Sequence, residues 1–238
     1  MPEQGWQMLF NGKDLKGWTP KITGYKFGEN FGNTFRVKDG AISVSYDGYE
    51  GDFKGRFGHL FFKNPYSSYV FQTEYRFVGE QCKNGPGWAY KNSGVMIHGQ
   101  SGKSMTINQE FPVSSEVQIL GGDATGERHT GNLCTPGTNV VMDGKLITQH
   151  CTDSKSATYR GEDWVLLEIE VHGSGLVIHR INAQEVIRYE QIQYDPRDAD
   201  AKPLIKKDNL LIPSGTISLQ SESHPVEFRN VRIRKIAN

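Results

Sequence analysis

The sequence predicts an all-β protein in which two antiparallel sheets are stacked as a sandwich or jelly roll. Apolar residues alternate with polar ones along most of the chain, and no segment carries a helical apolar stripe of a dozen residues. Glycine is frequent, with 27 residues, and aromatic residues make up 11% of the chain, which suits turns and strands. About ten strands are more than a small barrel needs, so two layers are expected.

The predicted strands follow in chain order. Residues 34–38 and 41–45 form a hairpin at Asp39-Gly40, a pair typical of a type I′ turn. The middle of the chain contains strands at 69–77, 93–98, 115–120, 164–172, 176–181 and 184–189, the last two joined at Asn182-Ala183. Two strands that begin near Gly215 and Val226 end the chain. At Asn230 the alternation of apolar and polar residues shifts by one position, and this parity slip predicts a bulge or twist.

The chain is expected to form one domain over residues 1–238, because all-β sandwiches of this length are often undivided. Long segments without strand pattern separate the strands. Loops of this length in a compact domain are usually functional, and together they are expected to build a pocket over the concave face of one sheet. These segments are residues 45–58, 79–91, 99–112, 121–163 and 190–213.

Charge and leader signals limit the partners. The formal net charge is zero, so nothing in the overall charge favours nucleic acid or an anionic membrane. No apolar run is long enough for a membrane helix, and the sequence as written starts without a leader. The protein is therefore expected in the cytoplasm, or in the periplasm or outside the cell if a leader has been removed.

The three cysteines leave two alternatives open. Cys134 and Cys151 flank a segment rich in turn residues and could form a disulfide, with Cys82 left over. An odd number of cysteines without a motif also fits three free thiols.

Polar side chains share faces of several predicted strands. Glu116 and Gln118 are two apart and stand roughly 7 Å from each other, opposite apolar neighbours. Asn92 and His98 share a face of the preceding strand, although a lone histidine there is more often structural. A solvated outer face would show the same alternation.

If one face is concave, these polar residues converge on it and can bind a ligand. Amides, carboxylates and arginine bind sugar hydroxyls in pairs, and Trp88 and Tyr90 can stack on a sugar ring or simply anchor their loop. The predicted row contains Gln72, Glu74, Arg76, Asn92, His98, Glu116, Gln118, Gln220, Glu222, Glu227 and Arg229.

Other chemistries lack their motifs. The chain has no dinucleotide-binding glycine pattern, phosphate-binding loop, His-Glu-x-x-His, Cys-x-x-Cys or Gly-x-Ser-x-Gly. No organic cofactor is expected, and no zinc site can be read from the scattered histidines.

Five segments resemble the 3-keto-disaccharide hydrolase family in the expected order. They are residues 5–18, 92–98, 115–120, 215–220 and 226–231. The resemblance implies a concanavalin A-like lectin/glucanase sandwich that acts on glycosides oxidised at C3 of glucose. The C3 carbonyl acidifies the C2 proton, so a base can remove it and the group at C1 can leave by elimination, after which water adds.

The resemblance also implies site residues. Glu116 would be the base or a metal ligand, His98 the acid or a metal ligand, and Arg229 would stabilise the enolate. A divalent ion at the C3 carbonyl would fit the chemistry, with ligands unassigned. The chain departs from the family pattern at His98-Gly99, Asp123 and Asn182-Ala183, which leaves the substrate open. Sugar binding is expected from Asn92, Gln118, Gln220, Glu74, Trp88 and Tyr90.

Two other functions fit the same fold. A noncatalytic carbohydrate-binding module would use the polar face for binding alone. A conventional glucanase needs a strand with three acids, and Glu168-Ile-Glu170 supplies only two of them.

Overall fold

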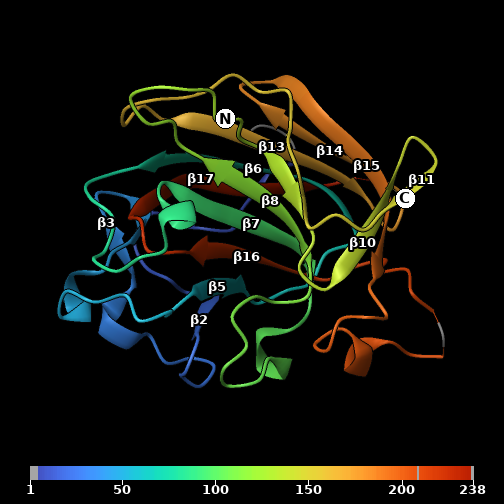
Figure 1. Ribbon diagram of the computed structural model, residues 1–238, viewed down its shortest axis with the longest axis horizontal. Coiled ribbons are helices and arrows are strands. Elements are labelled where there is room, and N and C mark those ends of the chain that lie inside the picture. The colour runs from blue at the N-terminus through green and yellow to red at the C-terminus, as the bar shows by residue number, and fades with distance from the viewer. Residues whose placement is uncertain (1–4, 208, 237–238) are drawn as a thin grey trace.

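Two antiparallel sheets pack face to face, which confirms the predicted sandwich (Figure 1). The computed structural model describes residues 5–207 and 209–236. The ten-stranded sheet has the order β11 (Lys145–Ile147), β10 (Thr138–Met142), β15 (Gln184–Tyr194), β14 (Leu176–Ile181), β13 (Val165–His172), β6 (Ser68–Phe77), β17 (Val226–Lys235), β4 (Ala41–Val44) and β3 (Phe35–Lys38), and β1 (Gln7–Met8) also pairs with β17. The seven-stranded sheet has the order β12 (Cys151–Thr152), β9 (Asn132–Cys134), β8 (Ser115–Leu120), β7 (Asn92–Gly99), β16 (Thr216–Ser221), β5 (Gly58–Phe62) and β2 (Trp18–Ile22).

Helical structure in the described residues is limited to short 3₁₀ turns. None of it is long and apolar enough to cross a membrane. These turns are η1 (Phe31–Asn33), η2 (Asp47–Tyr49), η3 (Gly87–Ala89), η4 (Gly102–Ser104) and η5 (Lys202–Leu204).

The turn and bulge signals in the sequence have their predicted effects. Asp39 and Gly40 have φ of 49° and 77°, as a type I′ hairpin requires. At Asn230, where φ is 53°, the pairing of β17 with β6 shifts register, so the parity slip is a β-bulge.

The predicted loops contain strands that the period did not reveal. β9 to β12 lie inside the segment 121–163, where each is too short to show an alternation. β5 is buried at all five positions, so its two faces do not differ in polarity, and β2 contains Pro20.

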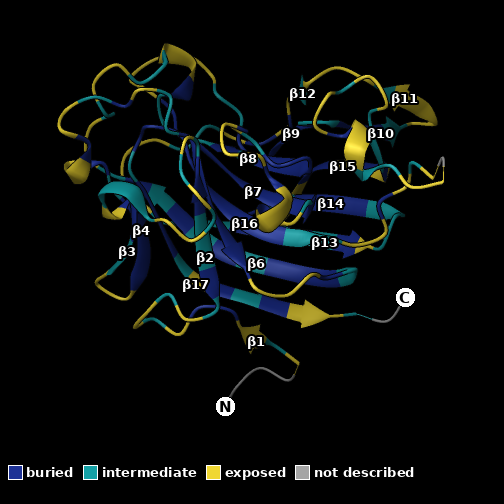
Figure 2. Ribbon diagram, turned by 90° about the horizontal axis from the view of Figure 1, so that it is seen from below, coloured by how far each residue is buried: buried dark blue, intermediate teal, exposed yellow. Residues whose placement is uncertain are grey.

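One face of the seven-stranded sheet forms the core with the other sheet. Val95, Val117 and Leu219 point inward and are fully buried, together with aromatic residues of the ten-stranded sheet such as Phe71. The alternate residues of β7, β8 and β16 point outward but are mostly buried as well, because loops cover them (Figure 2). A polar face that is shielded from solvent is where a small ligand can be bound.

A disulfide joins Cys134 and Cys151 across the neighbouring edge strands β9 and β12. Cys82 is a half-buried free thiol. Of the two alternatives left open by the sequence, the single disulfide is the one that forms.

Candidate functional site

A cavity of about 290 Å³ opens on the outer face of the seven-stranded sheet. Strands β7, β8 and β9 supply its floor, and loops supply its walls. Its lining consists of Trp88, Asn92, Phe111, Glu116, Gln118, Cys134, Pro136, His150, Cys151 and Glu222. Three residues expected from the sequence to bind sugar, Asn92, Gln118 and Trp88, therefore lie with Glu116 in one pocket, which is called the inner pocket below.

The floor of the inner pocket depends on a missing side chain. Gly94 of β7 pairs with Gln118 of β8, and the register of β7 with β16 places it beside Gln220. A Cβ atom at position 94 would lie 2.6 Å from Oε1 of Glu116 and 3.1 Å from Oε1 of Gln220. Glycine thus leaves the space in which the Glu116 carboxyl group leans toward Gln220.

Glu116 and Glu222 form a pair of buried carboxyl groups. Their side chains belong to residues that are 5% and 3% exposed. Burial raises the pKa of Glu116 to about 8, an effect that Gln220 opposes. Burial also raises the pKa of Glu222, followed by the charge of Glu116, while Arg128 acts in the opposite direction. Both carboxyl groups therefore keep their protons to a higher pH than an exposed glutamate does, and they are coupled, an arrangement in which one can donate and the other accept a proton.

Several polar atoms in this region have no protein partner. Among the described residues they include Oδ1 of Asn92 and Oε2 of Glu222, and the Gln220 amide has only the Glu116 carboxyl group beside it. Each buried polar atom without a partner costs about 1–3 kcal/mol, so the arrangement suits a ligand rich in hydroxyl groups or ordered water.

The two aromatic residues of the 79–91 loop differ in their roles. Trp88 stacks on Phe57 with ring centroids 5.7 Å apart and remains 55% exposed, so its other face is open to a sugar ring. Tyr90 instead packs edge-on against His224, with centroids 5.1 Å apart, and it does not line the inner pocket. Tyr90 has the anchoring role that the sequence left as its alternative.

His98 lies outside the pocket, contrary to the sequence prediction. It sits at a break in the register between β7 and β16 and has a φ of 51°. Its Nε2 atom is 2.8 Å from the carbonyl oxygen of Gly173, in the turn between β13 and β14. Burial lowers the pKa of its ring to about 4. The irregular backbone turns this side chain away from the row that Asn92 begins, so its contact is structural.

Arg229 and Glu74 also lie elsewhere, because β17 and β6 belong to the ten-stranded sheet. Arg229 donates from Nε to Oε2 of Glu74 at 2.9 Å and packs over the ring of Trp164. Gln72, Arg76 and Glu227 occupy the same sheet. The prediction that these residues converge with Glu116 is wrong because parity defines a face of a strand and does not identify its sheet.

The glucanase alternative gains no support from the geometry. Glu168 and Glu170 of β13 are bound to Arg180, at 2.9 and 2.8 Å. Both carboxylates belong to the ten-stranded sheet and form an ordinary ion-pair network there.

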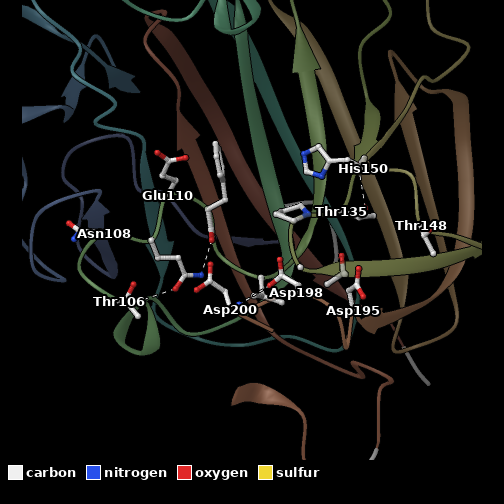
Figure 3. A pocket seen from close by; sticks show the side chains of 15 residues that line it. Thr106, Asn108, Glu110, Thr135, Thr148, His150, Asp195, Asp198 and Asp200 are labelled. Carbon is white, nitrogen blue, oxygen red and sulfur yellow. Dashed lines mark hydrogen bonds between the residues drawn. The ribbon is translucent and has the colours of Figure 1, made fainter. Parts of the chain in front are cut away.

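A larger cavity of about 590 Å³ adjoins the inner pocket and is called the outer trough (Figure 3). The two cavities share Phe111, Pro136 and His150. Figure 3 shows acidic and hydroxyl side chains around the trough. The charged ones are Glu110, Asp195, Asp198 and Asp200, and Arg197 pairs with Asp195 at 2.8 Å. A ligand longer than one sugar ring can therefore extend from the inner pocket into a polar trough.

Some of the residues around the site gave no clear signal in the sequence. Phe111, Pro136 and His150 lie in loops whose path the period of the strands does not define. Glu222, which the sequence analysis included in the predicted polar row, does line the inner pocket, directly after the last residue of β16.

The family model of the 3-keto-alpha-glucoside-1,2-lyase-like domain matches residues 5–234. The chain belongs to this family. A carbohydrate-active role follows for the protein. A search among curated proteins returned no significant match.

Solved structures share the sandwich. A candidate glycosyl hydrolase from Parabacteroides distasonis is 20% identical, with a TM-score of 0.57 over 98% of this chain and 95% of that one. A second from the same organism is 16% identical, with a TM-score of 0.57 over 97% and 99%. The laminarinase from Rhodothermus marinus is 11% identical, with a TM-score of 0.50 over 98% and 96%. At these identities the likeness extends to the fold.

Proposed function

We propose that the protein cleaves the glycosidic bond of 3-keto-glycosides by elimination between C1 and C2 of the oxidised sugar. The observation that carries the proposal is the buried Glu116 and Glu222 pair on the wall of a pocket of about 290 Å³. The family to which the chain belongs supports the choice of substrate.

The two carboxyl groups divide the proton transfers. We assign the base to Glu116 and the acid to Glu222, because the charge of ionised Glu116 raises the pKa of Glu222 and so favours the protonated form of Glu222. Ionised Glu116 takes the C2 proton that the C3 carbonyl acidifies, the C1–O bond breaks, and Glu222 protonates the departing oxygen. Water then adds across the new C1–C2 double bond, which gives the free 3-keto sugar. If the alkene departs before water adds, the outcome is that of a lyase.

Binding groups surround the pair. Trp88 offers the open face of its ring to the sugar, and Asn92 and Gln118 offer amides to its hydroxyl groups. The leaving group extends into the outer trough.

If Glu116 is a metal ligand instead of the base, oxygen atoms of Glu116, Glu222 and Asn92 would hold a divalent ion, and both carboxyl groups would then be ionised. These are hard donors of the kind that Mg²⁺, Ca²⁺ or Mn²⁺ binds, and Oδ1 of Asn92 has no other partner. The described residues contain no group of three or more histidine, cysteine or acidic side chains that could hold a metal ion, so the protein would offer only two carboxyl groups and one amide oxygen. A bound ion would polarise the C3 carbonyl.

The decisive experiment follows a 3-keto-glycoside, such as 3-keto-trehalose or a 3-keto aryl glucoside, by NMR with and without a chelator. Cleavage by the wild type, loss of cleavage in Glu116→Gln, and exchange of the C2 proton for deuterium in D₂O are expected. Binding of the substrate without turnover would instead identify a carbohydrate-binding module. Activity that survives chelation would remove the ion from the proposal.

The disulfide bears on the compartment. Disulfides persist in oxidising surroundings, and this one joins two strands beside the pocket. We therefore propose a periplasmic or extracellular location, which fractionation of the source cells tests.

A further inference from the structure

The polar floor of the inner pocket continues under Phe111 to a histidine that no part of the proposed mechanism uses. His59 of β5 pairs directly with Gln220 of β16, which meets Glu116 over Gly94. Side chains of directly paired residues on one face lie about 4.5–5.5 Å apart at Cβ. Glu116, Gln220 and His59 therefore form one row that crosses four neighbouring strands, β8, β7, β16 and β5, with the gap at Gly94 of β7.

The row contains unpartnered polar atoms in the most buried part of the face. His59, Gln220 and Ser218 are each 0% exposed. Both ring nitrogens of His59 and Oγ of Ser218 lack a hydrogen-bond partner, and the Gln220 amide has only the Glu116 carboxyl group beside it. Native proteins seldom bury such atoms without partners, because each one forfeits its hydrogen bonds to water. The gathering of such atoms on one face, next to a pocket, indicates that a polar ligand supplies their missing hydrogen bonds.

The chemistry of His59 suits a neutral polyol. Burial, followed by the charge of Lys21 on the next strand, lowers the pKa of the His59 ring to about 3. A neutral imidazole has one donor and one acceptor, and the Gln220 amide has both kinds of group as well. Neighbouring hydroxyl groups of a sugar, each a donor and an acceptor, match this pair.

Phe111 separates His59 from the open cavities. Its ring packs edge-on against His59, with centroids 6.0 Å apart at an interplanar angle of 75°, and it also contacts Phe57. Phe111 is half-buried, belongs to no strand, and lines both the inner pocket and the outer trough. Because Phe111 lines both cavities and covers His59, a displacement of its side chain toward the outer trough would uncover the row.

We propose that His59 and Gln220 form a second part of the sugar-binding surface and hydrogen-bond the substrate after Phe111 has moved aside. The inference rests on the proposed function for its ligand, a glycoside with its ring in the inner pocket. It adds two contacts and a gate to that site.

The test observes the His59 ring directly. In protein labelled with ¹⁵N histidine, the ring signals of His59 are assigned by their absence in His59→Leu. Addition of methyl glucoside, or of the 3-keto-glycoside to Glu116→Gln, should shift them. His179 is the internal control, since it is equally buried but bonded at both ring nitrogens, to Gly131 and Tyr189 at 2.8 and 3.0 Å, and its signals should stay.

Variants supply an independent readout. His59→Leu should weaken glycoside binding by about tenfold or more without lowering the Tm, because it removes unpartnered polar atoms as well as the contact. His59→Gln should restore part of the affinity. Phe111→Ala should make His59 react with diethyl pyrocarbonate, which bound glycoside then prevents.

The outcomes separate the two proposals. Turnover of the 3-keto-glycoside with stationary His59 signals and unchanged affinity in His59→Leu would overturn this inference and leave the proposed function intact. A His59 shift on glycoside binding without turnover would support the inference and overturn the proposed reaction.

Discussion

Replacing Glu116 with glutamine should stabilise the protein at alkaline pH and abolish its proposed activity. The pKa of the Glu116 carboxyl group is raised from the ordinary 4.5 to about 8, with burial as the main cause. The folded state therefore holds a proton that the unfolded state releases, and stability falls as pH rises from about 4.5 to 8. At about 1.4 kcal/mol per pH unit, the fall that Glu116 causes is at most about 5 kcal/mol.

Urea unfolding of the wild type and Glu116→Gln at about pH 5 and pH 8.5 measures this directly. At the lower pH, only half a unit above the ordinary pKa of 4.5, ionisation of Glu116 in the unfolded state should separate the two proteins by less than about 1 kcal/mol. At the higher pH the variant should be more stable by several kcal/mol. Buried histidines with lowered pKa values, such as His179, act in the opposite direction at lower pH, but they are common to both proteins and cancel in the difference.

A difference in stability between variant and wild type that stays constant from pH 5 to 8.5 would refute this reasoning. It would mean that Glu116 titrates like an exposed carboxyl group and is unsuited to share protons with Glu222. Glu222→Gln is the matched variant, because it removes the other buried carboxyl group; in Glu116→Gln the pKa of the remaining Glu222 should fall, since the charge of Glu116 raises it.

Three further predictions test the site and its frame. Replacing Cys134 and Cys151 with serine removes a link across 17 residues, which should lower the free energy of unfolding by about 3 kcal/mol, measured by urea titration; an equal loss in wild type with reductant is the control, and no loss in either would contradict it. Trp88→Ala should raise KM about tenfold with little change in kcat if the ring stacks on the sugar, whereas an unchanged KM would exclude the stacking. Arg229→Ala should leave kcat/KM unchanged and cost at most about 1 kcal/mol of stability, since the Arg229 side chain is 41% exposed. Arg229 and its partner Glu74 both lie on the ten-stranded sheet, away from the inner pocket. A large loss of activity would contradict the assignment of the pocket.

The sequence was sufficient for the fold and for part of the site, and particular residues show where it stopped. Alternation in residues 115–120 correctly puts Glu116 and Gln118 on the face opposite the core. The prediction that Arg229 lies near Glu116 failed because β16 and β17, although consecutive in the chain, belong to different sheets. A short turn carries the chain across the sandwich, and a period of two contains no information about such a crossing.

His59 shows the same limit in another form. Its strand is buried on both faces, so polarity does not distinguish the outer face, and only the pairing of β5 with β16 brings the ring beside Gln220. Phe111 owes its position to a loop fixed by side-chain hydrogen bonds, among them one from Gln109 to the Phe111 carbonyl at 2.8 Å. Contacts of that kind connect residues whose order in the chain follows no regular spacing.

Gly94 has a consequence for how members of the family diverge from one another. The space above its α-carbon is occupied by the Glu116 side chain of the neighbouring strand, which would have to shift to admit any side chain at position 94. Glycine here and glutamate at 116 should therefore be inherited or lost together. The residues at positions 94 and 116 therefore divide the relatives into those that keep both glycine and glutamate and those that have replaced both. A different chemistry should be sought among the relatives that have replaced both.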